Sequence, residues 1–403
     1  MLSLAWRNLG RNRRRSTLTA LAIGFAVMVL VFAMSMQTGQ YAIMIDNATR
    51  LASGHLQLQA ADYLDNPRLA AVVEHARDLT EILLADPAVA AAFPRLATFA
   101  LASHGERSYG AGVAGVVPDA ERTWSSLPSM VESGRYLAGS PDEAVVGSLL
   151  ARNLGVTLND ELVILGTTRE GSIAALAPRV VGIISTGIDE FDRSLLQVPI
   201  DAFRDAFELD DEASAIVVMA KRPGEAKALA ASLSRQFAPL HARAWPELMP
   251  ELEQAIEVDR VSAYFIYLLL GIMVTFSIVN TFIMTVFERT RELGMLMAIG
   301  LTPGRLQVLM QAEAALLCLG GVLLGAIAGT ALVLWLHDVG IPLGDVSDEL
   351  VRRFHMPTRM YPAFDWFDLL IPSLLMLAAT QIAAFLPTLR IRKLQPMEAL
   401  RAT

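Results

Sequence analysis

The chain has 403 residues, of which 54% are hydrophobic and 18% are charged, and its mean hydropathy is +0.44. This composition excludes an ordinary soluble protein and predicts a membrane protein of two or three domains. The single cysteine, Cys318, excludes both a disulfide framework and a cysteine-based metal site.

Residues 1–16 predict a cytoplasmic amphipathic elbow helix at the membrane surface. Leu2, Ala5, Trp6 and Leu9 recur at the spacing of one helix face, and the same stretch holds five arginines and no acid. A plain basic flank of the following apolar run would satisfy the same pattern. A cleaved signal peptide is disfavoured, because the run is too long and no A-x-A site follows it.

Four apolar runs predict four membrane spans. Residues 18–36, 261–286 and 314–336 are long enough to cross a hydrocarbon layer and carry no charge, whereas residues 369–386 are shorter and interrupted by polar residues. The expected order is as follows: elbow helix 1–16, first span 17–40, soluble domain 41–258, second span 259–287, connecting segment 288–304, third span 305–336, short loop 337–366, fourth span 367–387 and tail 388–403.

The distribution of basic residues predicts the orientation. Both ends of the chain are rich in arginine, so we expect both termini in the cytoplasm, which four spans permit. Residues 41–260 hold 18 basic and 31 acidic residues, as expected for an extracytoplasmic segment. The loop 337–366 fits less cleanly, because it contains three arginines.

The segment 41–258 predicts an α/β domain with a β-rich subdomain inserted at about 120–205. Alternating or short apolar runs predict strands, and two stretches have helical spacing. The expected strands are 55–59, 93–102, 161–165, 180–184 and 215–220, and the expected helices are 78–90 and 224–237.

The connecting segment 288–304 predicts a short helix, a tight turn and the start of the third span. Its charged residues lie at i, i+3 spacing, and an apolar flank follows them. Gly300 stands where a helix ends, Thr302 is a suitable N-cap, and Pro303 suits the first helical position. A plain loop between two helices is the alternative. Glu313, near a span end, is expected to face protein, toward Arg305 or a neighbouring subunit.

Motifs of catalysis are absent from the sequence. It contains no G-x-x-x-x-G-K-[ST], no G-x-S-x-G and no H-E-x-x-H, and its six histidines are dispersed. We therefore expect no catalytic residue, no cofactor site and no metal site in this chain. The acidic stretch 189–192 is better explained as a solvated loop than as a cation site.

Several motifs together resemble the FtsX-like permease family. They are Glu288-Arg289, Arg291-Glu292-Leu293-Gly294, Ala298-Ile299-Gly300, Glu313-Ala314, three glycines between 320 and 325, and the tail Pro396-Met397-Glu398-Ala399-Leu400-Arg401. In the soluble segment, Gly134-Arg135-Tyr136-Leu137, Val146-Gly147, Leu150-Ala151 and Leu154-Gly155-Val156 resemble the MacB-like periplasmic core. Met297 and Asn159-Asp160 depart from the family pattern.

The resemblance implies a non-enzymatic permease subunit of an ABC transporter, a multi-pass protein of the bacterial inner membrane. ATP and Mg²⁺ would be bound by a separate ATPase subunit, because no ATPase region is expected in this chain. The implied ATPase-coupling residues are Glu288, Arg289, Arg291, Glu292, Leu293, Met295, Leu296, Ile299 and Gly300. The other implied partners are a second permease subunit, in a homo- or heterodimer, and membrane lipids, with a periplasmic lipoprotein carrier or adaptor; nucleic acid is not among them.

Three functions remain open from the sequence. The leading one is extraction of lipoproteins or lipids from the membrane, as in LolC and LolE; the others are a MacB-like export module with a periplasmic adaptor and an FtsX-like regulator of a cell-wall hydrolase. The spans hold few polar residues, so a lipid-anchored substrate is expected to approach sideways. The expected entry lies in the outer leaflet, between the first span and the second span of the facing subunit. Its residues are Ile23, Val27, Val31 and Met34 of the first span and Tyr267, Leu270 and Val274 of the second. Packing against lipid or protein is the alternative role of these residues.

Overall fold

The computed structural model describes residues 5, 7–8, 13–64, 69–342 and 359–388. These residues divide into two compact units. The helical unit comprises the described residues up to 42, residues 255–342 and residues 359–388. The α/β unit comprises residues 43–64 and 69–254. Most of the expected elbow helix, most of the short loop and the tail motif lie outside the described residues.

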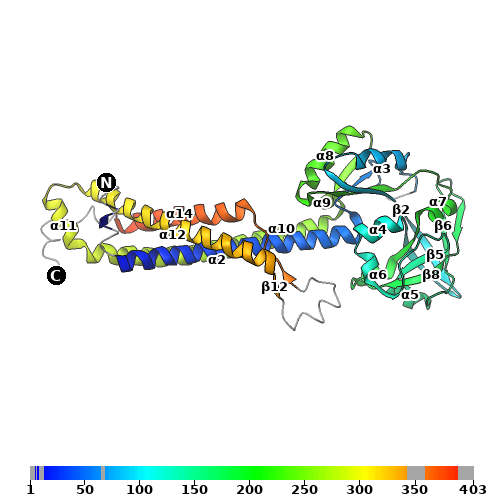
Figure 1. Ribbon diagram of the computed structural model, residues 1–403, viewed down its shortest axis with the longest axis horizontal. Helices are drawn as coiled ribbons and strands as arrows, with labels where there is room; N and C mark the ends of the chain where they lie inside the picture. Colours follow the sequence, from blue (N-terminus) through cyan, green and yellow to red (C-terminus); the bar gives the residue numbers. More distant parts are fainter. Residues whose placement is uncertain (1–4, 6, 9–12, 65–68, 343–358, 389–403) are drawn as a thin grey trace. The chain divides into compact units, whose positions relative to one another are not determined.

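The helical unit contains α2 (Arg13–Ala48), α10 (Pro250–Glu288), α11 (Thr290–Ala298), α12 (Pro303–Val339) and α14 (Trp366–Thr388), with a short pairing of β12 (Ile341–Pro342) and β13 (Arg359–Met360). Four of these helices are long and apolar enough to cross a membrane, as the sequence predicted. They run side by side, and α11 joins α10 to α12 (Figure 1). Two of them extend well past the expected spans, because α2 continues to Ala48 and α10 begins at Pro250.

Small residues hold α2 against α12. Gly321, Gly325 and Gly329 lie one helical turn apart on α12, and Ile23, Val27 and Val31 of α2 pack on them. A Cβ added at Gly321 would lie 2.7 Å from the carbonyl oxygen of Ala20, so the two backbones are in close approach. Van der Waals contact between closely spaced backbones is a main source of association between membrane helices.

The α/β unit is built on one sheet of eleven strands, in the described part of the chain. Its strands are β1 (Leu56–Gln59), β2 (Val89–His104), β3 (Arg107–Val116), β4 (Val131–Gly134), β5 (Glu143–Gly147), β6 (Val163–Thr167), β7 (Ile173–Leu176), β8 (Arg179–Ile184), β9 (Leu195–Pro199), β10 (Ala215–Ala220) and β11 (His241–Ala244). The main path runs β11-β1-β10-β2-β3-β9-β5-β8-β4, and β6 and β7 extend from β2. Its helices are α3 (Ala76–Leu84), α4 (Pro118–Trp124), α5 (Ser148–Leu154), α6 (Asp189–Ser194), α7 (Ile200–Phe207), α8 (Ala226–Gln236) and α9 (Trp245–Leu248).

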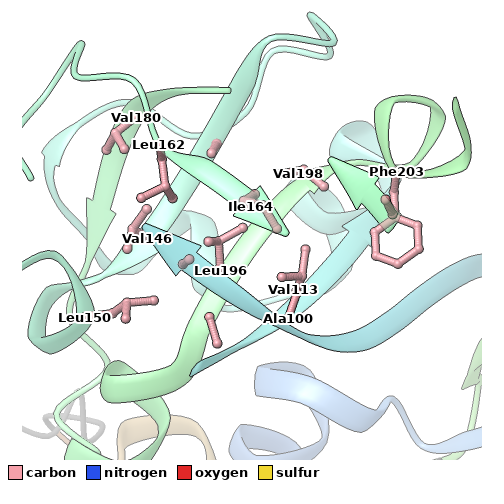
Figure 2. Packing of buried hydrophobic residues seen from close by; sticks show 14 of the residues in the cluster. Ala100, Val113, Val146, Leu150, Leu162, Ile164, Val180, Leu196, Val198 and Phe203 are labelled. Carbon is pink, nitrogen blue, oxygen red and sulfur yellow. The ribbon is translucent and has the colours of Figure 1, made fainter. Parts of the chain in front are cut away.

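The sheet serves two subdomains. In the first subdomain, β1, β10, β11 and the first half of β2 carry a core under α3 and α8. In the β-rich subdomain, the second half of β2 and strands β3 to β9 carry a core that includes Val113, Ile164 and Leu196 of the strands and Leu150 and Phe203 of helices α5 and α7, as Figure 2 shows. The strands predicted at 55–59 and 215–220 appear as β1 and β10.

The β-rich subdomain begins earlier than the expected boundary near 120. Strand β2 is 16 residues long, and its pairing changes from β10 to β3 at Leu96. The sequence pattern at 93–102 predicts a strand, but it does not show that one strand crosses from one subdomain to the other.

Candidate functional site

The candidate site is the segment between α10 and α12, and its short helix ends as the sequence predicted. Helix α11 stops at a glycine in the left-handed region, because Gly300 has a φ of 103°. The amide of Gly300 donates to the carbonyl of Met297 at 3.0 Å, and the amide of Leu301 donates to that of Leu296 at 3.1 Å. This double hydrogen bond is the Schellman motif, which closes a helix and reverses the chain.

The start of α12 follows two residues later. Thr302 has the extended backbone of an N-cap residue, and Pro303 takes the first helical position. The side chain of Thr302 makes no capping hydrogen bond, so only its backbone conformation fulfils the predicted role. The turn between α11 and α12 is therefore fixed by the glycine and the proline.

An apolar cluster fixes the inner face of α11. Leu293 is 1% exposed and packs with Val286 of α10 and with Leu306 and Met310 of α12. Leu296 lies at the edge of the same cluster. Truncation of a buried leucine to alanine costs about 2–5 kcal/mol, so this cluster is sufficient to hold α11 in one orientation.

An ion-pair network fixes the beginning of α11. Arg289 directs its Nε toward Oε2 of Glu292 at 3.1 Å and its Nη1 toward Oε2 of Glu313 at 2.8 Å. Asn8 donates from Nδ2 to the other oxygen of Glu313 at 2.6 Å. Burial alone would lower the pKa of Arg289, but the carboxylates of Glu313 and Glu292 raise that pKa above its ordinary value. The guanidinium therefore stays charged and joins the start of α11 to the third turn of α12.

The partner of Glu313 differs from the expected one. We expected Arg305 or a neighbouring subunit, but Arg289 and Asn8 contact the carboxylate. Arg305 is exposed and lies eight residues before Glu313, which is about 12 Å along a helix. The sequence correctly placed Glu313 against protein, since its side chain is 7% exposed.

The nine residues expected to couple to an ATPase separate into two groups. The structure brings Arg289, Glu292, Leu293 and Leu296 together as the buried or half-buried base of α11. The exposed residues are Glu288, Arg291, Met295, Ile299 and Gly300. Met295 and Ile299 are apolar, and Ile299 is 79% exposed. We call these five residues the exposed face of the connecting segment.

The first-span residues of the expected substrate-access surface are buried within this chain. Ile23, Val27 and Val31 are fully buried against α12, and Met34 is 6% exposed, so these side chains are not on the surface of this chain. On α10, Val274 is half-buried, and Leu270 is exposed. The exposed apolar side chains of α10 include Ile272, Met273 and Phe276.

Tyr267 belongs to a polar network that the sequence did not reveal. Its hydroxyl donates to Oε1 of Gln37 at 3.0 Å, and Nε2 of Gln37 donates to the hydroxyl of Tyr41 at 2.7 Å. Tyr41 donates to Oδ2 of Asp259 at 2.7 Å, and Thr38 donates to Asp368 of α14 at 2.8 Å. Asp259 and Glu288 are about 45 Å apart along α10, so one helix links this network to the candidate site. Polar residues separated by more than 200 positions give no spacing signal in the sequence.

Metal or cofactor residues do not gather at the site. No group of three or more His, Cys, Asp or Glu side chains is placed to hold a metal ion among the described residues. In the acidic stretch 189–192, Asp192 is buried and accepts hydrogen bonds from the amide and hydroxyl of Thr186. That carboxylate closes the turn before α6.

Two protein families match this chain. Residues 16–236 match the MacB-like periplasmic core domain, and residues 264–396 match the FtsX-like permease C-terminal region. The first match covers more than half of the chain, and the second includes the whole connecting segment.

Similar proteins were found among both sequences and solved structures. The chain is 25% identical over 334 residues to the lipoprotein-releasing system transmembrane protein LolC of Neisseria meningitidis serogroup B, covering 78% of each chain. It is 23% identical over 417 residues to LolE of Haemophilus influenzae, covering 98% of each chain. The crystal structure of the periplasmic region of MacB from Actinobacillus actinomycetemcomitans matches at 14% identity with a TM-score of 0.37, covering 52% of this chain and 96% of that one.

Proposed function

This chain belongs to the FtsX-like permease family and carries a MacB-like periplasmic core domain, which makes it an ABC permease subunit; we propose that a separate ATPase subunit drives it to release lipoproteins from the membrane. ATP and Mg²⁺ are bound by that ATPase. A second permease subunit, identical or related, completes the transporter in the inner membrane, with both termini of this chain in the cytoplasm.

The exposed face of the connecting segment carries this proposal. Met295 and Ile299 present apolar side chains beside the charges of Glu288 and Arg291, over a base held by Leu293 and by ion pairs. An apolar centre with a polar rim is the usual composition of a protein interface. A partner that binds here contacts a short helix, α11, which cannot rotate independently of α10 and α12.

Movement of α11 is expected to reach distant parts of the chain. Helix α11 is joined directly to α10 and, through a closed turn, to α12. The pair of Arg289 and Glu313 locks the start of α11 to the body of α12. Long helices that move as rigid bodies are a common route of conformational coupling, so ATP-driven displacement of α11 tilts both helices.

The lipoprotein cargo is supported by the relatives and by the surface of α10. LolC and LolE are named as components of lipoprotein-releasing systems. Met273 and Phe276 of α10 are 70% and 76% exposed, so acyl chains can lie along them without desolvating polar groups. The access surface that we propose therefore follows α10 and not the buried side of α2. A periplasmic carrier would receive the released lipoprotein.

A charged substitution on the exposed face tests the proposal. We expect Ile299→Asp to weaken ATPase binding by at least about tenfold, because a central apolar anchor becomes a desolvated charge. Ile173→Asp is the matched control, since Ile173 is 83% exposed on β7 of the α/β unit. The readouts are co-purification of the ATPase, its stimulated ATP hydrolysis, and release of a lipoprotein from proteoliposomes.

The outcomes separate the candidate functions. Loss of co-purification in Ile299→Asp alone supports docking at α11, and unchanged co-purification contradicts it. ATP-driven release of a lipoprotein supports the proposed cargo. Transport of a soluble compound with a periplasmic adaptor, or activation of a cell-wall hydrolase without transport, would replace lipoprotein release with one of the two alternative functions.

A further inference from the structure

Arg95 lies where strand β2 passes from one subdomain to the other. Arg95 pairs in register with Ala215 of β10, and the next residue, Leu96, pairs with Gly115 of β3. The amide of Ser214 donates to the carbonyl of Arg95 at 3.0 Å. Arg95 is therefore the last residue of β2 that pairs in register with β10.

The side chain of Arg95 contacts the end of the first long helix. Helix α2 continues into a π-helical turn, η1 (Thr49–Ser53), in which the amide of Gly54 donates to the carbonyl of Thr49 at 2.8 Å. Arg95 donates from Nη1 to the carbonyl of Ala52 in this turn. A cation is favoured at the C-terminal end of a helix, where carbonyl oxygens lack helical partners. Single π-turns in long helices occur frequently at functional sites.

The same guanidinium binds α4. Its Nη2 donates to Oε1 of Glu121, which is fully buried, whereas Arg95 itself is 15% exposed. Helix α4 packs on Phe93 and Met219 of the first subdomain through Ala120 and Trp124. The next residue of α4, Arg122, donates to the carbonyl of Leu137 in the β-rich subdomain. A continuous path of contacts thus runs from Ala52 through Arg95 and α4 to Leu137.

The junction around Arg95 borders a cleft that is partly open to solvent. This cleft of about 300 Å³ is lined by Leu51, Ala52 and Arg95 together with Leu127, Phe191 and Leu195 of the β-rich subdomain, against which Leu51 also packs. Close-packed interiors resist displacement, because each atom has neighbours on all sides. Space at this position leaves room for the two subdomains to shift relative to one another.

The ion pair itself has a second arrangement available. Nε of Arg95 and Oε2 of Glu121 are both buried, and neither has a hydrogen-bond partner among the described residues. A bidentate pair would satisfy both atoms, since arginine and carboxylate groups commonly form two parallel hydrogen bonds. Turning the guanidinium to form that pair draws Nη1 away from Ala52. The junction can therefore exist with Arg95 bridging α2 to α4, or with Arg95 bound to Glu121 alone.

We infer that Arg95 is a positioning residue for transport, which passes movement of the end of α2 to the β-rich subdomain by exchanging these two arrangements. The inference rests on the proposed function, because it assumes that ATP hydrolysis moves α2. We call Arg95, with its contacts to Ala52 and Glu121, the joint. The inference requires that the angle between the two subdomains of the α/β unit changes during the transport cycle. Discrete two-state elements of this kind are what physical coupling between distant sites needs.

The test measures the distance between the subdomains in the complete transporter. Spin labels are attached to cysteines introduced at Ala228 on α8 and Arg152 on α5, which are exposed, in a Cys318→Ala background. Distances are recorded by pulsed electron paramagnetic resonance in nanodiscs with the ATPase, without nucleotide and after trapping with ATP and vanadate. Lipoprotein release is measured in parallel. We expect a nucleotide-dependent change of the distance in the parent chain, loss of that change in Arg95→Gln, and about 2- to 30-fold slower release.

A matched variant separates the joint from general stability. Arg135→Gln also removes an arginine from a buried carboxylate, Glu143, but both residues lie within the β-rich subdomain. It is expected to keep the full nucleotide-dependent change of the distance. If Arg95→Gln does not reach the membrane, Arg95→Lys takes its place, because lysine keeps a charge near Glu121 but lacks the fork needed to reach Ala52 as well.

Each outcome decides the inference. A distance change that is lost in the Arg95 variant and kept in Arg135→Gln supports the joint. An unchanged distance response in the Arg95 variant overturns it, as does a parent chain that releases lipoprotein without any distance change, and in both cases the proposed function stands. A parent transporter that releases no lipoprotein on ATP addition overturns the proposed function, and the joint falls with it.

Discussion

Arg289 and Glu313 form a buried ion pair across 24 residues of sequence, with Nη1 of the arginine 2.8 Å from Oε2 of the glutamate. The pair fastens the first residue before α11 to α12, and Asn8 supplies the remaining hydrogen bond to the carboxylate. Removing one member of such a pair leaves a poorly compensated charge in a largely buried position, since the side chains of Arg289 and Glu313 are 16% and 7% exposed. The geometry therefore makes Glu313 as important for the connecting segment as the residues on α11 itself.

Glu313→Gln is expected to weaken the base of α11. The amide keeps the size of the side chain but removes the charge that faces Arg289, and the loss of a charged hydrogen bond costs about 2 kcal/mol. Thermal unfolding of the purified chain in detergent measures the loss. Glu257→Gln is the control, because Glu257 pairs with Arg260 on an exposed surface, where such a pair contributes less than about 1 kcal/mol. Equal melting temperatures of the two variants would contradict a structural role of Glu313.

The orientation of the chain in the membrane is open to a labelling experiment. Asp119 is 91% exposed in the α/β unit, and Met295 is exposed on α11. In a Cys318→Ala background, we expect an impermeant thiol reagent to label Asp119→Cys in cells with a permeabilised outer membrane, and Met295→Cys only after the inner membrane is disrupted. Labelling of Met295→Cys in cells with an intact inner membrane would exclude the proposed cytoplasmic position of the connecting segment.

His55 gives the α/β unit a pH dependence whose direction follows from its burial. Burial lowers the pKa of His55 below its ordinary value of 6.5, Asp46 raises this pKa to a smaller extent, and Arg50 lowers it slightly further. The neutral ring accepts a hydrogen bond at Nδ1 from the amide of Ala220 at 3.0 Å. The folded state thus binds this proton more weakly than the unfolded state does. The contribution of neutral His55 to the free energy of unfolding is complete above about pH 6.5. It is lost as the pH falls toward the lower pKa of the folded state, and the free energy of unfolding then decreases by up to about 1.4 kcal/mol per pH unit.

Hydrogen exchange of peptides from β1 and β10 measures this effect locally. Between pH 7.5 and 5.5, after correction for intrinsic exchange rates, protection of these strands is expected to fall in the parent chain. His55→Asn offers an oxygen acceptor at a similar position but does not titrate, so its protection is expected to stay constant. A parallel fall in both proteins would assign the pH dependence to another group.

Local patterns account for the parts of the fold that the sequence predicted. Strand β10 follows from the apolar run 215–220, and α11 ends at Gly300 because only glycine adopts its φ of 103° without strain. The exposed residues of α11 could also be expected, since a short helix that buries one apolar face leaves the opposite face on the protein surface.

Tertiary relationships account for what the sequence did not show. Helices α2 and α12 are apolar on all sides, so periodicity could not tell that Ile23 and Val27 face α12 and not a substrate. The pairing of Arg289 with Glu313 depends on how α10 and α12 pack, and no local spacing encodes it. Three glycines at intervals of four did mark the packed side of α12, and this signal could have identified the buried face of α2.

Gly325 offers the sharpest test of that packing. A Cβ at this position would lie 2.8 Å from the Cβ of Val27 and closer still to the carbonyl oxygen of Gly24, so alanine must push α2 and α12 apart. We expect Gly325→Ala to lower the stability of the helical unit by about 1–3 kcal/mol, as overpacking of a filled interior does. Gly320→Ala is the control on the same helix, because a Cβ at Gly320 would meet no atom within 4 Å.

The control is expected to behave in the opposite direction. Alanine has a higher helix propensity than glycine, by about 1 kcal/mol in a helix interior, so Gly320→Ala should leave the helical unit as stable as the parent or slightly more stable. Unfolding of the purified variants in a detergent titration, followed by tryptophan fluorescence, measures both changes. If Gly325→Ala stabilised the protein as much as Gly320→Ala does, the close approach of Gly24 and Gly325 would be excluded. The glycines of α12 would then serve some purpose other than bringing α2 into contact.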